Sequence, residues 1–544
     1  MQIRRLATIL VPLMVILGVV ALVARAGRSP LDQRQQSESG VAVDELRPIV
    51  ETVNAELRKN WEAAGLRPMS PASDLQVLRR ISLALVGTTP SLEELRGFES
   101  DRRPDRLSHW TRRYLADRRF SDYFAERLAR GLVGTDAGQF IVFRRDRFVE
   151  WLSEQIRNDV PYDQIVRTMI EEQGLWTGQP AVNFITAAVN DNQLDCNKLA
   201  GRTVRVFLGQ RIDCAQCHDH PFASWKQHQF EGLAAFYGQT LQTIAGIEDK
   251  TEHDGKPVEF EVEDRKTLKK RTVTPAVPFG ESWQVQDGTR RHQLASWITH
   301  PENRRFERSI ANRVWGLMFG RPYLQPVDDL PDPGEKLDLL DLLGRDFREH
   351  GYSLKRLIQV TTESQAYRLQ SQVPEEMSEG EVLRASEQWA VFPLIRLRPE
   401  QVIRSMRQAA SIQTYNQDTH LLIRIPRYFQ EFDFIREYGD LGDNELQDRG
   451  GTIPQRLLMM NGEIAQESLK VSPVTAAGRI ASLAPNDQKA IETAFLICLC
   501  RHPDPEETAH FLAELDEKKK NDRDTVIEDM MWSLFNSTEF SWNH

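Results

Sequence analysis

Apolar residues recur at three- and four-residue spacing along most of the chain, which is the period of an amphipathic helix. Phe148, Trp151, Leu152 and Ile156 show this spacing and predict a helix that ends near Pro161, because proline cannot continue it. The same period predicts further helices over residues 337–347, 354–362, 399–412 and 491–500. This pattern favours a mainly α fold.

Two helix boundaries are predicted by capping chemistry. Ser91, followed three residues later by Glu94, has the spacing of a capping box and predicts a helix that begins directly after Ser91. A second helix is expected over about residues 195–208. Gly209 is expected to end it, because glycine readily adopts the left-handed conformation that closes many helices.

The composition of the sequence changes between residues 246 and 289, where Gly, Pro and charged residues are frequent. Residues 258–262 alternate apolar and acidic side chains and residues 271–274 are rich in β-branched ones, so a short hairpin or small sheet is expected. We therefore predict two helical domains, residues 44–245 and 290–544, joined by a β-containing connector over residues 246–289.

The N-terminal region has the pattern of an export or membrane segment. Arg4 and Arg5 precede an uncharged run over residues 6–24, which is long for a signal-peptide core and about the minimum for a membrane-spanning helix. Residues 1–26 are thus predicted to be an uncleaved signal anchor or a cleaved signal peptide, and residues 27–43 a polar linker. Both alternatives place the remaining chain outside the cytoplasm, in a periplasm, anchored to the inner membrane or secreted after cleavage.

Composition narrows the functional classes only a little. The chain has 544 residues, of which 27% are charged, and a formal net charge of −10. A net negative charge argues against nucleic acid as a partner, because nucleic-acid binders usually carry a basic excess. The length is typical of two or three domains.

The segment Cys214-Ala215-Gln216-Cys217-His218 is the most informative motif in the chain. Two thiols at this spacing, followed directly by a histidine, are what covalent attachment of a c-type haem requires. Cys214 and Cys217 would add to the two vinyl groups, and His218 would supply an axial nitrogen to the iron. Because bacteria attach c-type haem outside the cytoplasmic membrane, the motif and the predicted export agree.

Other chemistries remain open for the same residues. Cysteine and histidine suit zinc, so the alternative interpretation is a zinc site built from Cys214, Cys217, His218, His220 and His228. A disulfide between the two motif cysteines is a third alternative. If haem binds, the second axial ligand decides between electron transfer and small-ligand binding, and the candidates are His228, Met169, Met318 and Met406.

Several longer strings resemble a known pair of domains. Residues 78–90 and residues 207–222, which include the CxxCH motif, resemble a planctomycete cytochrome-like domain of unknown function. Residues 312–315, 319–321, 326–329, 350–355 and 536–540 resemble its companion planctomycete C-terminal domain of unknown function. The resemblance implies an exported protein whose first domain is named for cytochrome c, and it implies no particular reaction.

Three further groups of residues have both a functional and a structural interpretation. Cys498 and Cys500 are expected to be buried thiols, and Cys196 a buried thiol or half of a distant bridge. A carboxylate-rich segment is expected to be a surface loop with ion pairs, with acid–base chemistry or calcium binding as the alternative; its residues are Asp433, Arg436, Glu437, Asp440, Asp443, Glu445, Asp448 and Arg449.

A third group surrounds the companion-domain strings. Asp328 and Asp329 are expected in a loop or helix cap. Arg313 is a candidate partner for Asp328 or for a haem propionate, a structural ion pair being favoured, and Trp315 is expected in the core beside Asn312.

The sequence therefore predicts an exported, membrane-tethered protein that binds haem c and exchanges electrons with an exported redox partner. The alternative from a different class is a non-redox extracytoplasmic scaffold or carbohydrate-associated protein, whose Cys/His cluster is a zinc site or a structural disulfide.

Overall fold

The computed structural model describes residues 38–136, 143–190, 193–263, 268–411, 414, 431, 433–439, 442, 446, 452–472, 475–517 and 522–544. This part of the chain is mainly helical with a few short strands, which confirms the predicted α class. The predicted signal or anchor segment, residues 1–26, lies outside it. None of the described helices has the length and apolarity needed to cross a bilayer.

The first part of the chain, up to residue 245, is a succession of helices with short connections. Its α-helices are α3 Val43–Ala63, α4 Asp74–Val86, α5 Leu92–Ser100, α6 Arg106–Ala116, α7 Arg118–Val133, α8 Arg145–Arg157, α9 Tyr162–Glu171, α10 Asn183–Thr186, α11 Cys196–Thr203 and α12 Gln227–Ala235. Short helical turns are η1 Pro180–Val182, η2 Val204–Leu208 and η3 Asp213–Gln216.

The later part of the chain, from residue 281, is also helical. Its helical elements are η4 Glu281–Trp283, α13 Arg290–Ile298, α14 Arg304–Phe319, α15 Leu339–Glu349, α16 Leu354–Glu363, η5 Ala366–Arg368, α17 Glu379–Glu387, α18 Pro399–Ala410, α20 Ile453–Asn461, α21 Glu463–Leu469, α22 Ala476–Leu483, α23 Asp487–Leu499, α24 Pro505–Glu517, α25 Arg523–Phe535 and α26 Thr538–Ser541.

The described strands form small antiparallel pairs. The pairs are β1 Val189–Asn190 with β2 Gln193–Leu194, β3 Thr240–Thr243 with β4 Gly246–Asp249, β5 Glu252–His253 with β6 Lys256–Pro257, β7 Glu261–Glu263 with β8 Lys270–Thr272, and β9 Ile395–Arg396 with β10 Trp542–Asn543. The β7–β8 hairpin is the one predicted around residues 258–274, and its ladder runs from Glu261↔Thr272 to Glu263↔Lys270. Its first strand thus begins three residues later than the alternating pattern does.

The predicted helix boundaries follow local chemistry closely. Ser91 caps α5 in a complete capping box with Glu94. Gly209, with φ +64°, ends the α11–η2 helix as expected. Helix α8 ends at Arg157 and not next to Pro161, because Asp159 already takes a left-handed backbone at φ 51°. The helices predicted over residues 337–347, 354–362, 399–412 and 491–500 correspond to α15, α16, α18 and α23.

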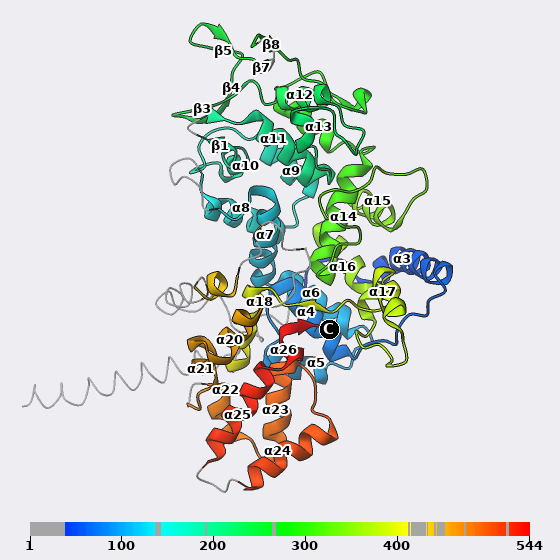
Figure 1. Ribbon diagram of the computed structural model, residues 1–544, viewed down its shortest axis with the longest axis vertical. Helices are drawn as coiled ribbons and strands as arrows, with labels where there is room; N and C mark the ends of the chain where they lie inside the picture. Colours follow the sequence, from blue (N-terminus) through cyan, green and yellow to red (C-terminus); the bar gives the residue numbers. More distant parts are fainter. Residues whose placement is uncertain are drawn as a thin grey trace, which may run out of the picture.

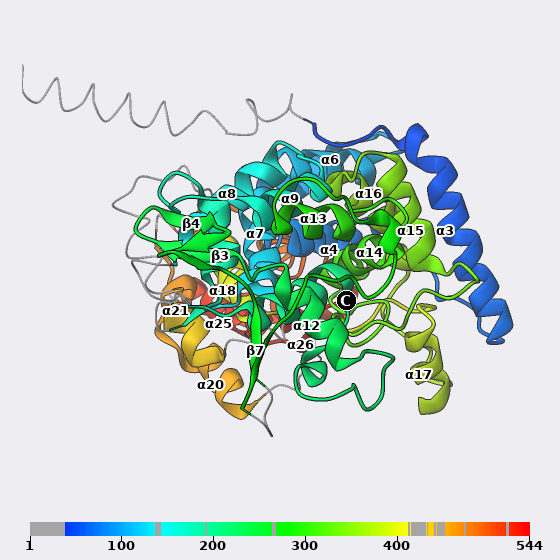
Figure 2. The same ribbon diagram turned by 90° about the horizontal axis from the view of Figure 1, so that it is seen from above.

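Two clusters of buried apolar side chains hold the helices together. The larger takes nearly all its residues from positions 46–392, and so draws on both sides of the β-containing connector. The smaller takes nearly all of its residues from positions 397–540. In Figure 1 the hairpins and α11–α13 lie at one end of the elongated molecule and α22–α25 at the other. Figure 2 shows α3 along one flank, where it contacts α15 and α16.

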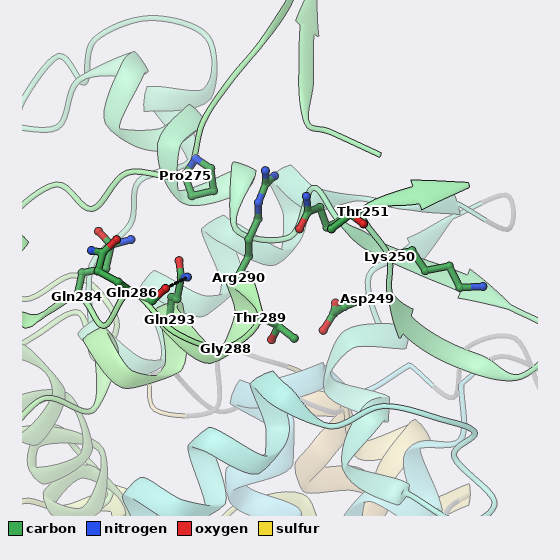
Figure 3. A pocket seen from close by; sticks show the side chains of 11 residues that line it. Asp249, Lys250, Thr251, Pro275, Gln284, Gln286, Gly288, Thr289, Arg290 and Gln293 are labelled. Carbon is green, nitrogen blue, oxygen red and sulfur yellow. Dashed lines mark hydrogen bonds between the residues drawn. The ribbon is translucent and has the colours of Figure 1, made fainter. Parts of the chain in front are cut away.

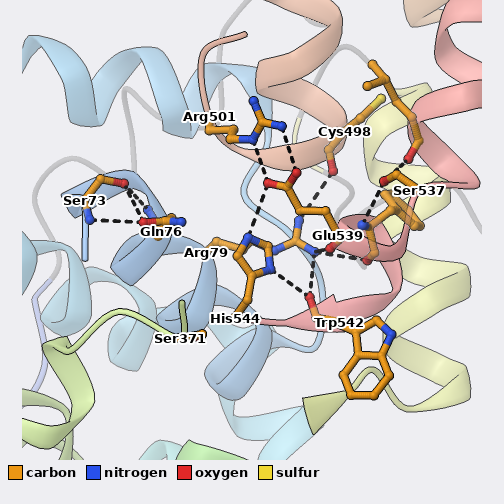
Figure 4. Close-up of polar contacts among 12 residues, drawn as sticks. Ser73, Gln76, Arg79, Ser371, Cys498, Arg501, Ser537, Glu539, Trp542 and His544 are labelled. Carbon is orange, nitrogen blue, oxygen red and sulfur yellow. Dashed lines mark hydrogen bonds and ion pairs between the residues drawn. The ribbon is translucent and has the colours of Figure 1, made fainter. Parts of the chain in front are cut away.

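Buried arginines join helix α4 to the end of the described chain. Arg79 is fully buried and donates hydrogen bonds to the carbonyl oxygens of Cys498, Glu539, Phe540 and Trp542. Figure 4 shows these hydrogen bonds of Arg79. Burying a guanidinium is costly unless hydrogen bonds compensate it. The two terminal nitrogens of Arg79 donate these bonds, whereas its Nε has no partner among the described residues, so Arg79 is a structural tie between distant segments.

Candidate functional site

The CxxCH motif lies on a surface turn between two helices. The helix formed by α11 and η2 ends at Gly209, the turn η3 carries Cys214, and α12 begins at Gln227. The turn lies close to α11, since a Cβ atom added at Gly201 would be 3.0 Å from the Asp213 Oδ1. A glycine at this point therefore lets the turn approach the helix.

The apolar residues of the turn are buried, whereas the cysteines and the histidine of the motif are exposed. Ile212 and Ala215 are fully buried, whereas Cys214, Cys217 and His218 are exposed. The turn is closed by the Ala215 amide donating to the Ile212 carbonyl at 2.8 Å and by the Cys217 amide donating to the Cys214 carbonyl at 3.3 Å. Both motif cysteines are free and exposed in the structure.

The neutral His218 ring is held in one tautomer by the neighbouring backbone. Its Nδ1 lies 2.7 Å from the carbonyl oxygen of Asp219, and because a carbonyl can only accept, Nδ1 carries the proton and donates. The lone pair of the neutral ring is therefore on Nε2. This is the arrangement of a metal-binding histidine, in which the nitrogen that does not bind metal donates to a backbone carbonyl.

His220 has the opposite arrangement. Its Nδ1 accepts hydrogen bonds from the amides of Phe222 at 3.2 Å and Ala223 at 2.9 Å. The proton of its neutral ring is then on Nε2, so this ring has no lone pair left for a metal. His220 closes the loop after the motif, together with its own amide, which donates to the Trp225 carbonyl at 2.8 Å.

Asp219 fastens the loop to the start of α12. Its carboxylate accepts from the Gln227 amide at 3.0 Å and pairs with Lys226 at 3.2 Å. The Gln227 hydrogen bond, then the one from Lys226, lowers the pKa of Asp219, and His228 adds a small favourable charge contribution. His228 thus lies on the same surface as the motif.

The residues predicted as a zinc set are not gathered into one centre. Across the described ranges, no group of three or more His, Cys, Asp or Glu side chains is placed to hold a metal ion. All five residues of that set, Cys214, Cys217, His218, His220 and His228, are within the described ranges. A closed zinc site needs four convergent ligands, so zinc binding here stays a prediction.

The three methionines considered as second axial ligands are buried in the apolar cores. Met169, Met318 and Met406 are each no more than 1% exposed, whereas His218 is on the surface. His228 is the candidate that shares the exposed face of the motif.

The segment just before the motif is clamped by the loop of residues 326–332, a contact that the sequence did not reveal. Arg211 pairs with Asp328 at 2.8 Å, and its amide donates to Asp329 at 3.3 Å. The Leu330 amide donates to the Gly209 carbonyl at 2.6 Å. Asp328 and Asp329 are in a loop as expected, but the cation that Asp328 meets is Arg211 and not Arg313.

Gln210 extends the clamp, since its side-chain amide donates to Asp332 at 2.6 Å, and Arg305 also pairs with Asp332 at 2.8 Å. Just before this loop, Asn312 exchanges two hydrogen bonds of 2.9 Å with the backbone of Leu324. Trp315 is fully buried and stacks on Phe319, as a core residue does.

The remaining cysteines have structural surroundings. Cys498 and Cys500 are buried, which confirms that prediction, and burial raises the pKa of both thiols. Burial likewise raises the pKa of Cys196 to about 12, and its Sγ lies 3.5 Å from the Tyr237 carbonyl oxygen. These thiols are poor nucleophiles, unlike an exposed motif cysteine.

The carboxylate-rich segment falls largely outside the described residues. Asp433 and Arg436 form an exposed pair at 2.9 Å, one helical turn apart, which is what the surface interpretation predicts. Glu437 borders an open hollow of about 480 Å³ beside Leu457. Outside the described residues lie Asp440, Asp443, Glu445, Asp448 and Arg449.

Comparison with known families matches two stretches of the chain. Residues 52–242 match the family model PSCyt2, described as a protein of unknown function (DUF1549). Residues 290–421 match the family model PSD1, described as a protein of unknown function (DUF1553). No curated protein and no solved structure matches the chain. The motif and its turn fall in the first match, and the clamping loop falls in the second.

Proposed function

In a chain that carries a PSCyt2 domain followed by a PSD1 domain, we propose that Cys214, Cys217 and His218 bind a c-type haem outside the cytoplasm and that the protein exchanges electrons with an exported partner. The haem would supply one-electron chemistry at its iron. Cys214 and Cys217 would supply the covalent attachment, and His218 would supply an axial ligand.

The tautomer of His218 carries this proposal. The Nδ1–H of the ring donates to the Asp219 carbonyl, so the nitrogen of the neutral ring that would coordinate iron is Nε2. Next to it, His220 has its Nδ1 committed as an acceptor. The two histidines of the motif region are thus divided into one ligand and one structural residue.

The surroundings of the motif suit an apolar macrocycle. Phe222, four residues after His218, is 96% exposed although its loop is held by the His220 hydrogen bonds. Covering an exposed aromatic ring with apolar surface is favourable, and the apolar face of a porphyrin would supply such a surface. Phe222 would then help to hold the haem by packing.

Electron exchange follows from the exposure of the site. Because Cys214, Cys217 and His218 all face solvent, a haem attached there would keep one edge at the surface, within reach of a partner protein. The predicted N-terminal export segment, if used, delivers the chain to the compartment in which such haem is attached.

The test is expression with a cytochrome c maturation system, with export, and analysis of the purified chain. We expect a Soret band, and haem that stays with the chain on a denaturing gel. Cys214→Ala, Cys217→Ala and His218→Ala should each lose most of this signal. Cys196→Ala, which removes a partly buried thiol outside the CxxCH motif, is the matched control and should keep it. A colourless wild-type product with both motif thiols titratable would overturn the proposal.

A further inference from the structure

A second polar feature lies at the hairpin end of the molecule, and most of its residues fall between the two family matches. A cavity of about 640 Å³ opens between the end of β4 and the start of α13. Four glutamines line it, Gln239, Gln284, Gln286 and Gln293, and Pro275 supplies its apolar wall. We call this cavity the glutamine cleft; Figure 3 shows its side chains.

The charged residues of the glutamine cleft are neutralised by partners within the protein. Arg290 pairs with Glu259 at 2.7 Å, and Lys250 pairs with Glu248 at 3.1 Å. Asp249 accepts two hydrogen bonds, each 2.8 Å long, from the buried guanidinium of Arg291. A charged ligand would have to compete with these pairs, so the cleft has no unbalanced charge with which to select an ion.

Amides are what the cleft leaves available to a ligand. Gln239 donates to Glu259 at 3.3 Å, and Gln293 donates weakly to the Gln286 backbone at 3.5 Å. The side-chain amides of Gln284 and Gln286 make no hydrogen bond to another residue of the described ranges. Each side-chain amide offers donors and an acceptor at once. Adjacent hydroxyl groups, which also donate and accept, are the neutral chemistry that matches such a set.

We propose that the glutamine cleft binds a neutral carbohydrate. The volume is within the range of about 300–1,000 Å³ for small-molecule sites, and Pro275 can meet the apolar face of a sugar ring. A peptide is the less favoured occupant, because Pro275 is the one large apolar side chain in the lining, and peptide recognition needs apolar pockets or an open strand edge.

The cleft is independent of haem binding. Its residues belong to the stretch around β4 and α13, whereas the CxxCH motif is on the η3 turn. Loss of one function should therefore leave the other intact, and failure of the haem proposal would not touch this one.

The test is isothermal titration calorimetry of the full chain with cellobiose, maltose, lactose and chitobiose at millimolar concentration. Triglycine serves as the neutral amide probe and inorganic sulfate as the anion. We expect at least one disaccharide to bind, and triglycine and sulfate not to bind. Gln284→Ala and Gln286→Ala should each weaken binding about fivefold, which is the effect of one net hydrogen bond.

Gln488→Ala, an exposed glutamine on α23, is the matched control and should leave the affinity unchanged. Thermal unfolding of each variant checks that its fold is intact. Absence of binding by all four disaccharides overturns the proposal. Equal affinity of the cleft variants, or binding of triglycine or sulfate in place of sugar, overturns it as well.

Discussion

Arg211 and Asp328, 117 residues apart in the chain, are joined by two hydrogen bonds of 2.8 Å and 3.1 Å between the guanidinium and one carboxylate oxygen. Arg211 lies three residues before Cys214, and Asp328 belongs to the second matched family domain. The pair therefore connects the segment just before the CxxCH motif, in the first matched region, to a loop in the second.

We expect Asp328→Asn to loosen the turn without unfolding the protein. Arg211 is 42% exposed, so the free energy of unfolding should fall by less than about 1 kcal/mol. Amide hydrogen exchange over residues 210–218 should nevertheless become several-fold faster, because the turn loses one of its anchors. Asp433→Asn breaks an exposed pair elsewhere and should leave exchange at the turn unchanged. Identical exchange in wild type and Asp328→Asn would show that the clamp does not depend on this pair.

Arg79 should be among the most sensitive positions in the protein. Replacement by leucine removes the donor to four carbonyl oxygens, two of them in buried hydrogen bonds, and we expect a loss of roughly 3 kcal/mol in the free energy of unfolding. Chemical denaturation followed by circular dichroism measures it. Arg47→Leu, at an exposed pair with Asp44, is the control and should change stability by less than about 0.5 kcal/mol. Similar midpoints for the two variants would mean that Arg79 is not a structural tie.

These contacts show which features the sequence could predict. The capping box of Ser91 and the left-handed Gly209 depend on residues within a few positions, so both were predictable. The partner of Asp328 was not, because any exposed arginine has the right chemistry and only the tertiary fold brings Arg211 to it.

The same limit applies to buried charge and to the motif. Arg79 lies in the middle of an apolar helix, where sequence patterning would place it on the surface, and it is buried because distant carbonyl groups accept from it. The motif residues Cys214, Cys217 and His218 could be identified from the sequence alone. The different hydrogen-bonding roles of His218 and His220 could not be predicted, because they depend on which backbone group each Nδ1 contacts.

Glu400 should make stability fall in acid. Burial alone would raise its pKa, but the charges of Arg127 and Arg398 outweigh burial and lower the pKa from 4.5 to about 2. A lowered pKa means stabilisation that is present above pH 4.5 and is lost as the pH falls toward about 2. The shift corresponds to roughly 3 kcal/mol. Glu400→Gln should lower the melting temperature near neutral pH and flatten its decline in acid.

Glu307 provides a control for this prediction, because its pKa shift has the opposite sign to that of Glu400. Burial raises its pKa to about 7 in spite of its contact with Arg348. A raised pKa means stabilisation that is complete below pH 4.5 and is lost as the pH rises through about 7. Glu307→Gln should therefore raise the melting temperature above neutral pH relative to wild type. Parallel pH profiles for both variants and wild type would contradict the assignment of either group.

His220 offers a sharp test of the division between the two histidines of the motif region. Its Nδ1 accepts from the amides of Phe222 and Ala223, and the side-chain oxygen of asparagine occupies the same position relative to the backbone as that nitrogen. His220→Asn should therefore keep the loop closed, whereas His220→Leu should open it.

In chains matured with haem, we expect His220→Asn to carry as much haem per chain as wild type and His220→Leu several-fold less. The haem absorbance of denatured protein measures this ratio, and hydrogen exchange over residues 218–225 measures the loop. His218→Asn provides the comparison, because asparagine cannot replace the axial Nε2, and its product should lack the spectrum of histidine-ligated iron. If His220→Asn lost haem as completely as His218→Asn, the ring of His220 would itself be a ligand, and the role that we assign to its Nδ1 would be wrong.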